Sequence, residues 1–270
     1  MHSHPWNQPQ GDRLWLIAGT GEGPPLAETL LARGWRLQVS VVSRAAAGAY
    51  RPHPALDLRI GTIGAGATHA SDAGVARELE QAQGLADPFR WVIDASHPFA
   101  CRISASLARV CSAQGQPLLR LERPLLPLGE ATLLPDLLAL GEQVAAGERL
   151  LLAIGGRQLA CVVEQSPQAV HHARLLPAAP GLQQAMAAGL APERVACLRP
   201  GGNGELERAL CRRWAISSVL CRRSGGVSEG LWHGISASLG LRLLLLDRPP
   251  EPQGSERLAL EALLRRLKRP

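Results

Sequence analysis

The sequence predicts an α/β protein of two Rossmann-like lobes, each built on a mostly parallel sheet, with a cleft between the lobes. Three observations predict this fold. Short apolar runs alternate with amphipathic helical stretches, which is typical of βαβ units. A glycine-rich turn at residues 19–23 follows the first apolar run. The alternation stops at a proline-rich stretch, residues 123–127, and then resumes.

The N-terminal half predicts five strands, over residues 14–18, 36–42, 56–60, 91–94 and 117–121. Three helices are expected between them, over residues 24–33, 72–83 and 101–114. The first helix begins at Pro24, because proline is favoured in the first helical turn, and it ends before Gly34. Val75, Leu79 and Ala82 recur at helical spacing in the second helix.

The C-terminal half predicts strands over residues 150–154, 173–176, 195–198, 217–221 and 241–247. Helices are expected over residues 137–146, 181–188, 205–213 and 228–239. A terminal helix over residues 255–268 would have Ser255 as its N-cap. We therefore expect a loose arm over residues 1–12, one α/β domain over residues 13–126 and a second over residues 127–270.

The basic residues limit which catalytic mechanisms and which binding partners are possible. Of 29 Lys and Arg residues only Lys268 is a lysine, which excludes a Schiff-base or P-loop lysine from the folded body. The net charge of +6 predicts an anionic partner, and arginine suits bidentate contacts to carboxylate or phosphate. A coding bias toward arginine is the alternative. The 6 cysteines lack zinc-ligand spacing, so no metal site is expected.

Neither a membrane nor a nucleic acid is an expected partner. No apolar run approaches the roughly 18 residues of a membrane helix, and the N-terminus lacks the apolar region of a signal peptide. We therefore expect a cytoplasmic protein. The positive charge is distributed, and aromatic residues make up only 3% of the chain, which argues against stacking on single-stranded nucleic acid. The oligomeric state does not follow from the sequence.

The glycine-rich turn is a candidate dinucleotide site, formed by Gly19, Thr20, Gly21, Glu22 and Gly23. Glycines allow close backbone approach there, and a helix N-terminus favours phosphate. Pro24 stands where the standard fingerprint has its third glycine, and a tight turn without a ligand is the alternative. An NAD site places an acid after the second strand, whereas this chain has Ser43 and Arg44, which suit a 2′-phosphate. We therefore expect NADP(H), with a solvated Arg44 as the alternative.

A polar loop follows the predicted fourth strand. Asp94, Ser96 and His97 lie where the strand order of a doubly wound sheet reverses, which predicts catalytic groups. Arg102, one turn into the next helix, is a candidate for holding an anionic group. In the alternative interpretation Asp94 and Ser96 cap that helix and His97 is packed.

These segments together resemble the precorrin-6A reductase family, which includes the cobalt-precorrin-6A reductases. The matching residues are 19–23, 94–100, 102–104, 119–124, 223–226 and 246–249. The resemblance implies NADPH-dependent reduction of a ring double bond in precorrin-6A, or in its cobalt form, giving precorrin-6B in corrin biosynthesis. The substrate would be a tetrapyrrole with many carboxylates.

The resemblance also implies that the two domains bind different molecules. The first domain would bind NADPH and the second the substrate. The candidate contacts for anionic groups of the substrate are Arg102, in the first domain, and Arg157, Arg223, Ser224 and Gly225, in the second. This chain has Gly21 where the family commonly has serine and Arg223 where it commonly has lysine. Arg223 can bind an anion, but it cannot readily donate a proton.

The sequence also has features of three other classes of protein. Residues 226–230 match the G-x-S-x-G nucleophile elbow, but the only histidine after Ser228 is His233, just five residues further on, which opposes the Ser-acid-His order of a serine hydrolase. A non-catalytic two-lobed protein that binds anions or tetrapyrroles remains open, and NADPH affinity would separate it from a reductase. A nucleotide-sugar transferase also has two such lobes, and its donor preference would identify it.

Overall fold

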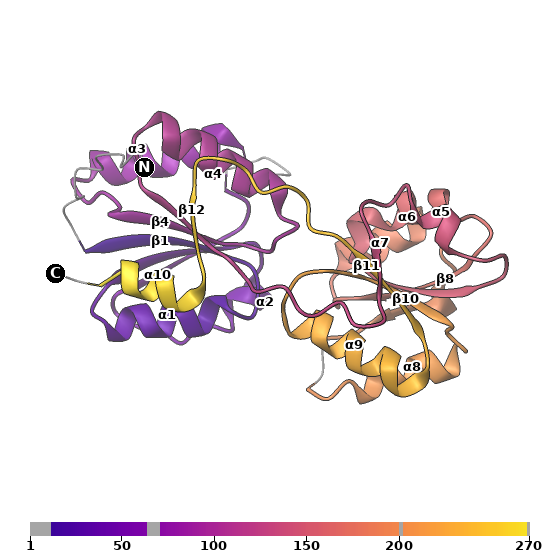
Figure 1. The fold of residues 1–270 in the computed structure, drawn as a ribbon. Coiled ribbons are helices and arrows are strands. Elements are labelled where there is room, and N and C mark those ends of the chain that lie inside the picture. The colour runs from indigo at the N-terminus through magenta and orange to yellow at the C-terminus, as the bar shows by residue number, and fades with distance from the viewer. Residues whose placement is uncertain (1–11, 64–70, 200–201, 269–270) are drawn as a thin grey trace. The chain divides into compact units, whose positions relative to one another are not determined.

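The computed structural model describes residues 12–63, 71–199 and 202–268, so the expected arm over residues 1–12 lies outside them except for Asp12. The chain forms two compact units (Figure 1). Unit 1 takes the chain up to Arg123 and again from Pro249, and unit 2 runs from Pro124 to Arg248. No helix in the described ranges has the length and apolarity needed to cross a membrane.

Unit 1 is built on a parallel sheet with the strand order β3-β2-β1-β4-β5-β12. Its strands are β1 (Arg13–Ala18), β2 (Arg36–Val41), β3 (Leu56–Ile60), β4 (Trp91–Ala95), β5 (Leu118–Leu121) and β12 (Glu256–Leu258). Its helices are α1 (Gly23–Ala32), α2 (Arg44–Ala47), α3 (Asp72–Gly84), α4 (Cys101–Ala113) and α10 (Leu260–Arg266). The expected reversal of strand order between the first and fourth strands is confirmed, because β1 lies between β2 and β4.

Alternating strand residues of unit 1 build two apolar cores. Leu14 and Leu16 face one core with α1 and α10, whereas Trp15 and Ile17 face the other with α3 and α4. Both faces of the sheet are therefore covered (Figure 1), which is the arrangement of a doubly wound fold.

The C-terminal segment corrects the predicted domain boundary. Residues 249–270 belong to unit 1, whereas the sequence placed them in the second domain. Strand β12 pairs with β5, and Leu263 of α10 and Leu267, which directly follows α10, are fully buried in the core of unit 1. The indole nitrogen of Trp35 donates to the carbonyl of Leu267 (3.0 Å). The expected capped helix is also corrected: α10 starts after Ala259, so Ser255 does not cap it.

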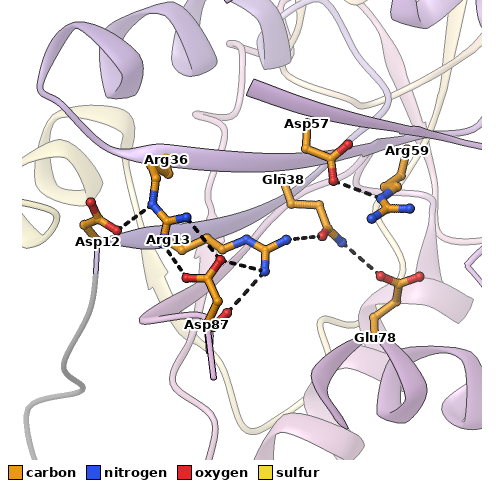
Figure 2. A network of polar contacts seen from close by, with 8 residues as sticks. All are labelled: Asp12, Arg13, Arg36, Gln38, Asp57, Arg59, Glu78 and Asp87. Carbon is orange, nitrogen blue, oxygen red and sulfur yellow. Dashed lines mark hydrogen bonds and ion pairs between the residues drawn. The ribbon is translucent and has the colours of Figure 1, made fainter. Parts of the chain in front are cut away.

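A polar network lies across the starts of β1 and β2 (Figure 2), whereas the glycine-rich turn follows the other end of β1. Arg13 donates to the buried Gln38 (2.8 Å), which in turn donates to Glu78 of α3 (3.0 Å). Arg36 pairs with Asp12 and with Asp87. Several arginines thus serve internal ion pairs, and these do not contribute to binding an anionic partner.

Unit 2 repeats the architecture with the strand order β9-β8-β7-β10-β11-β6, again in parallel. Its strands are β6 (Thr132–Leu134), β7 (Arg149–Ala153), β8 (Val170–Leu175), β9 (Val195–Cys197), β10 (Ser218–Arg222) and β11 (Arg242–Leu246). Its helices are α5 (Leu140–Gln143), η1 (Gly156–Gln158), α6 (Leu159–Gln165), α7 (Ala179–Ala187), η2 (Pro192–Arg194), α8 (Glu205–Arg213) and α9 (Val227–Leu239). Figure 1 shows α8 and α9 on one face of this sheet and α5, α6 and α7 on the other.

Candidate functional site

The predicted site residues lie on equivalent loops of the two units. In unit 1 the turn after β1 and the loop after β4 leave adjacent strand ends, since Ala18 pairs with Ala95. In unit 2 the turn after β7 and the loop after β10 are likewise neighbours, because Ala153 pairs with Cys221. Ligands of open α/β sheets bind at such strand ends, where the strand order reverses.

The turn after β1 leaves open space beside its own backbone at two of its glycines. A Cβ atom added at Gly19 or Gly21 would meet no atom within 4 Å. At Gly23 it would lie 2.3 Å from the hydroxyl of Tyr50 and 2.8 Å from the Cβ of Ala18. Gly23 therefore permits close packing of α1, which is the role of the third glycine in a dinucleotide fingerprint, although it comes one residue before the expected position.

The equivalent turn of unit 2 is closed. A Cβ atom at Gly156 would lie 2.3 Å from the amide oxygen of Gln184 and 3.2 Å from the Cα of Gly181, both in α7. The turn leads into the three-residue helix η1 instead of a long helix. The space beside Gly19 and Gly21 of unit 1 is therefore open, whereas the space beside Gly156 of unit 2 is occupied by α7.

Ser43 and Arg44 lie at the start of α2, after β2, and both are exposed. The Ser43 hydroxyl accepts a hydrogen bond from the Ala46 amide (3.2 Å) and so caps this helix. Its own hydroxyl hydrogen remains available to a ligand.

A cavity of about 390 Å³ lies near the ends of β2 and β3. Ser40, Arg59, Thr62, Arg77 and Glu78 are among its lining residues. The sequence analysis did not single out this cavity. Its two arginines are further candidate contacts for an anionic group at this edge of the sheet.

Asp94 is held in a buried ion pair. Its side chain is 1% exposed, and Arg120 donates to one carboxylate oxygen (2.5 Å) while the Ser96 amide donates to the other (3.0 Å). Arg120 also binds Ser104 (2.9 Å) and Glu251 (2.5 Å). Both oxygens of Asp94 are thus engaged, which gives this carboxylate a role in holding the loop after β4.

The other two residues of this loop are placed differently. Ser96 is buried, and its hydroxyl lies 3.3 Å from that of Ser104. His97 is half-buried, and its Nδ1 accepts a hydrogen bond from the Phe99 amide (3.1 Å). A neutral imidazole that accepts at Nδ1 carries its proton on Nε2. Of the three predicted catalytic residues, Asp94 and Ser96 are buried, and His97 is the most accessible.

The candidate anion contacts divide between the units. Arg102 is exposed in the first turn of α4 in unit 1, and Arg157 is exposed in η1 of unit 2. Arg223 follows β10, and its guanidinium lies 3.4 Å from Asp247. Arg223 therefore pairs with Asp247, whereas the alternative that the sequence suggested to an anionic ligand was a surface ion pair with Glu229. Within the described part of the chain, its buried Nε has no hydrogen-bond partner.

The turn after Arg223 is tightly constrained. Ser224 is buried, and Gly225 has a positive φ of 69°. A Cβ atom at Gly225 would lie 2.1 Å from the carbonyl oxygen of Pro124, so only glycine fits. The Gly225 amide donates to the buried Glu229 (2.5 Å), and the other oxygen of Glu229 has no hydrogen-bond partner in the described ranges. The Gly225 amide, which we expected to face an anionic ligand, is therefore already hydrogen-bonded within the protein.

Sequence reasoning missed Arg123, which reaches the glycine turn. Its Nη2 donates to the Thr20 hydroxyl (2.6 Å) and lies 3.2 Å from a carboxylate oxygen of Glu22. The signal was the Leu-Glu-Arg-Pro segment at residues 121–124, which the resemblance included without assigning a role to its arginine. Within the described ranges, no group of three His, Cys, Asp or Glu residues is arranged to hold a metal ion.

Comparisons with known proteins agree along nearly the whole chain. The family model described as Precorrin-6x reductase CbiJ/CobK matches residues 13–268. A cobalt-precorrin-6A reductase of Synechocystis sp. is 32% identical over 87% of this chain and 88% of its own length. A precorrin-6A reductase of Rhodobacter capsulatus is 30% identical over 93% of this chain and 94% of its own.

A solved structure agrees with these sequence matches. The structure described as CobK precorrin-6A reductase is 29% identical and aligns with a TM-score of 0.75, covering 94% of this chain and 96% of that one. Since the family model spans almost all of the described fold, the chain belongs to the precorrin-6x reductase family.

Proposed function

We propose that this protein is an NADPH-dependent reductase of precorrin-6A or cobalt-precorrin-6A that forms the corresponding 6B product in cobalamin biosynthesis. The observation that carries the proposal is the open glycine turn of unit 1, in a chain that belongs to this family. Its closed counterpart in unit 2 supports a single dinucleotide site, placed in unit 1.

The residues after β1 and β2 suit the two charged parts of the cofactor. Gly19 and Gly21 allow the turn backbone to approach a pyrophosphate at the start of α1. Ser43 and Arg44 provide a hydroxyl and a guanidinium for a 2′-phosphate, where an NAD site has an acid. We therefore propose NADPH in preference to NADH.

When bound, the reduced nicotinamide supplies a hydride to one carbon of the substrate double bond. His97 is the proposed proton donor to the neighbouring carbon: its imidazolium form, protonated from solvent, gives up the Nε2 proton and becomes neutral, and the Phe99 amide orients the neutral ring through Nδ1. Asp94 is a positioning residue, because its pair with Arg120 and its bond to the Ser96 amide fix the loop that carries His97.

Arg102, Arg157 and Arg223 are the proposed contacts for substrate carboxylates. Arg223 is the best placed of the three, since its guanidinium is partly exposed beside the constrained turn at Ser224 and Gly225. Tetrapyrrole carboxylates are exposed and flexible, and a guanidinium can bind them in bidentate fashion.

The direct experiment mixes the protein with NADPH and either precorrin-6A or its cobalt form, and follows NADPH absorbance and product mass. We expect oxidation of NADPH and a product heavier by two hydrogens with at least one of the substrates. Saturable NADPH binding without turnover of either substrate would instead support a non-catalytic tetrapyrrole-binding protein.

His97→Ala tests the proposed proton donor. We expect kcat to fall by about 10²–10⁴-fold, which is the usual contribution of a general acid, while the melting temperature stays near that of the wild type. Ser112→Ala, an exposed change further along α4, is the control. A wild-type kcat in His97→Ala would show that this histidine is structural.

A further inference from the structure

We propose that Arg123 is a positioning residue that adapts the glycine turn of unit 1 to an anionic cofactor, by neutralising Glu22 and by holding Thr20. This inference rests on the proposed function, because it takes that turn as the place where the cofactor phosphates bind.

The geometry lets one side chain control both sides of the turn. The Nη2 atom of Arg123 bonds to Thr20 (2.6 Å) and to Glu22 (3.2 Å), the residues on either side of Gly21. The side chain of Arg123 is 6% exposed, so it has little freedom to take another position. Thr20 is held a second time, since its carbonyl accepts from the Gly23 amide (3.1 Å). The backbone around Gly21 is thereby fixed before any ligand arrives.

Charge gives Arg123 its second role. Glu22 immediately precedes α1 and stands at the N-cap position, where the helix favours negative charge. The same field is what a pyrophosphate needs, so an uncompensated Glu22 carboxylate would compete with it. At a separation of several ångströms such repulsion weakens binding by roughly tenfold or more. The ion pair with Arg123 removes most of that repulsion.

The fold explains why an arginine performs this task from a distance. Arg123 follows β5, and β4 separates β5 from β1 in the sheet. Its side chain must therefore reach across the end of one strand, over roughly 10 Å between the outer two strands. The Glu122 amide donates to the Leu258 carbonyl (2.9 Å), so pairing with the C-terminal segment fixes the backbone just before Arg123.

A double-mutant cycle tests the proposal on the full chain. NADPH affinity is measured by the change in nicotinamide fluorescence for the wild type, Arg123→Met, Glu22→Gln and the double variant. We expect Arg123→Met to weaken binding by about 10–100-fold. Glu22→Gln should tighten binding several-fold, since the charge of Arg123 is then uncompensated. The double variant should recover most of the affinity lost in Arg123→Met.

The chain offers a matched control pair. Arg109 and Asp72 form an exposed ion pair (2.8 Å) between α4 and α3, and the hydrogen bond from Arg109 lowers the pKa of Asp72 to about 2. Arg109→Met, Asp72→Asn and their double variant should bind NADPH within about twofold of the wild type. Salt gives a further check, because screening should shrink the defect of Arg123→Met as ionic strength rises.

Two results would overturn the proposal: wild-type affinity in Arg123→Met, or a double variant as weak as Arg123→Met. Melting temperatures and circular dichroism accompany every titration, and Arg123→Lys replaces the methionine variant where the latter unfolds. Arg123→Lys keeps the charge but loses the planar fork, so we expect an intermediate affinity. Absence of NADPH binding by the wild type would instead count against the proposed function itself.

Discussion

In unit 1 the turn after the first strand is open to a ligand, whereas in unit 2 the equivalent turn is filled by side chains of α7. The polar groups near the two sites differ in the opposite sense. Asp94 and Arg120 of unit 1 are fully engaged with each other and with their neighbours. In unit 2, a buried nitrogen of Arg223 and a buried oxygen of Glu229 have no hydrogen-bond partner among the residues that the structure describes.

The difference indicates how the two turns differ in accessibility. The space beside Gly19 and Gly21 is open, which supports the proposal that the cofactor binds unit 1. An unpaired buried polar atom costs about 1–3 kcal/mol, so the turn after β10 carries polar groups that its own fold leaves unsatisfied.

Replacing a glycine by valine should reduce cofactor affinity at the turn of unit 1 and stability at the turn of unit 2. Gly21→Val keeps the fold, because its side chain enters open space, but it should weaken NADPH binding by about 100-fold through steric exclusion. Gly156→Val should leave NADPH affinity unchanged and destabilise unit 2 by about 1–3 kcal/mol, because α7 already fills the space. Fluorescence titration and urea unfolding measure the two effects. If both variants bound NADPH normally, the glycine turn would not be the cofactor site.

A fall in pH should lower the free energy of unfolding of unit 2 more than that of unit 1. His172 of β8 is 1% exposed and packs on Trp214, and burial lowers its pKa to about 4. The unfolded chain takes up this proton at a higher pH than the folded one, so stability is lost as pH falls from about 6.5 toward 4. We expect unit 2 to lose about 2–3 kcal/mol over this range.

Hydrogen exchange resolved by peptide measures this loss in each unit separately. His172→Phe retains an aromatic contact with Trp214 and removes the titrating group, so it should flatten the pH dependence of unit 2. A dependence as steep as that of the wild type would place its origin elsewhere, and the adjacent buried His171, whose pKa burial also lowers, is the next candidate.

Arg223→Ala should affect the substrate and spare the cofactor. Loss of a charged hydrogen bond of about 1.5–3 kcal/mol predicts a 10–150-fold increase in KM for the tetrapyrrole, with unchanged NADPH affinity. Asp247→Asn is the informative partner, because it releases Arg223 from its ion pair and should lower KM. A wild-type KM for Arg223→Ala at low salt would remove this residue from the site.

The smallest expected effect concerns the choice between NADPH and NADH. Arg44→Asp should weaken NADPH binding by about tenfold more than NADH binding, since it replaces a cation by an anion beside the 2′-phosphate. Arg77→Ala, in the neighbouring cavity, is the matched comparison. If Arg77→Ala alone changed the preference, the cavity at β2 and β3 would carry the 2′-phosphate contact.

Local patterns in the sequence predicted the parts of the fold that depend on local chemistry. The glycine turn, Pro24 and the spacing of Val75 and Leu79 were enough to place β1, α1 and α3. The short strand β12 was not predicted, because its three residues carry no periodic signal and it forms only by pairing with β5. The same lack of local information led us to place the C-terminal segment in the second domain.

In the candidate site, too, the sequence predicted the residues that have a local signal and missed those that depend on distant partners. Gly19, Gly21, Asp94 and His97 were found because each lies directly after an apolar run. Arg120 and Arg123 were not, because their partners lie far away in sequence: Glu251 is 131 residues from Arg120, and Thr20 is 103 residues from Arg123. No spacing rule predicts such pairs from one sequence.

The path of the chain also bears on folding. Unit 2 is an insertion whose first and last residues meet, because the Arg248 side chain donates to the Pro124 carbonyl (3.2 Å). It is contained in one continuous segment, whereas unit 1 without its C-terminal segment lacks β12, the core residues Leu263 and Leu267, and the acceptor for Trp35. Unit 2 can therefore fold without the C-terminal segment, and unit 1 closes only when residues 256–267 have docked.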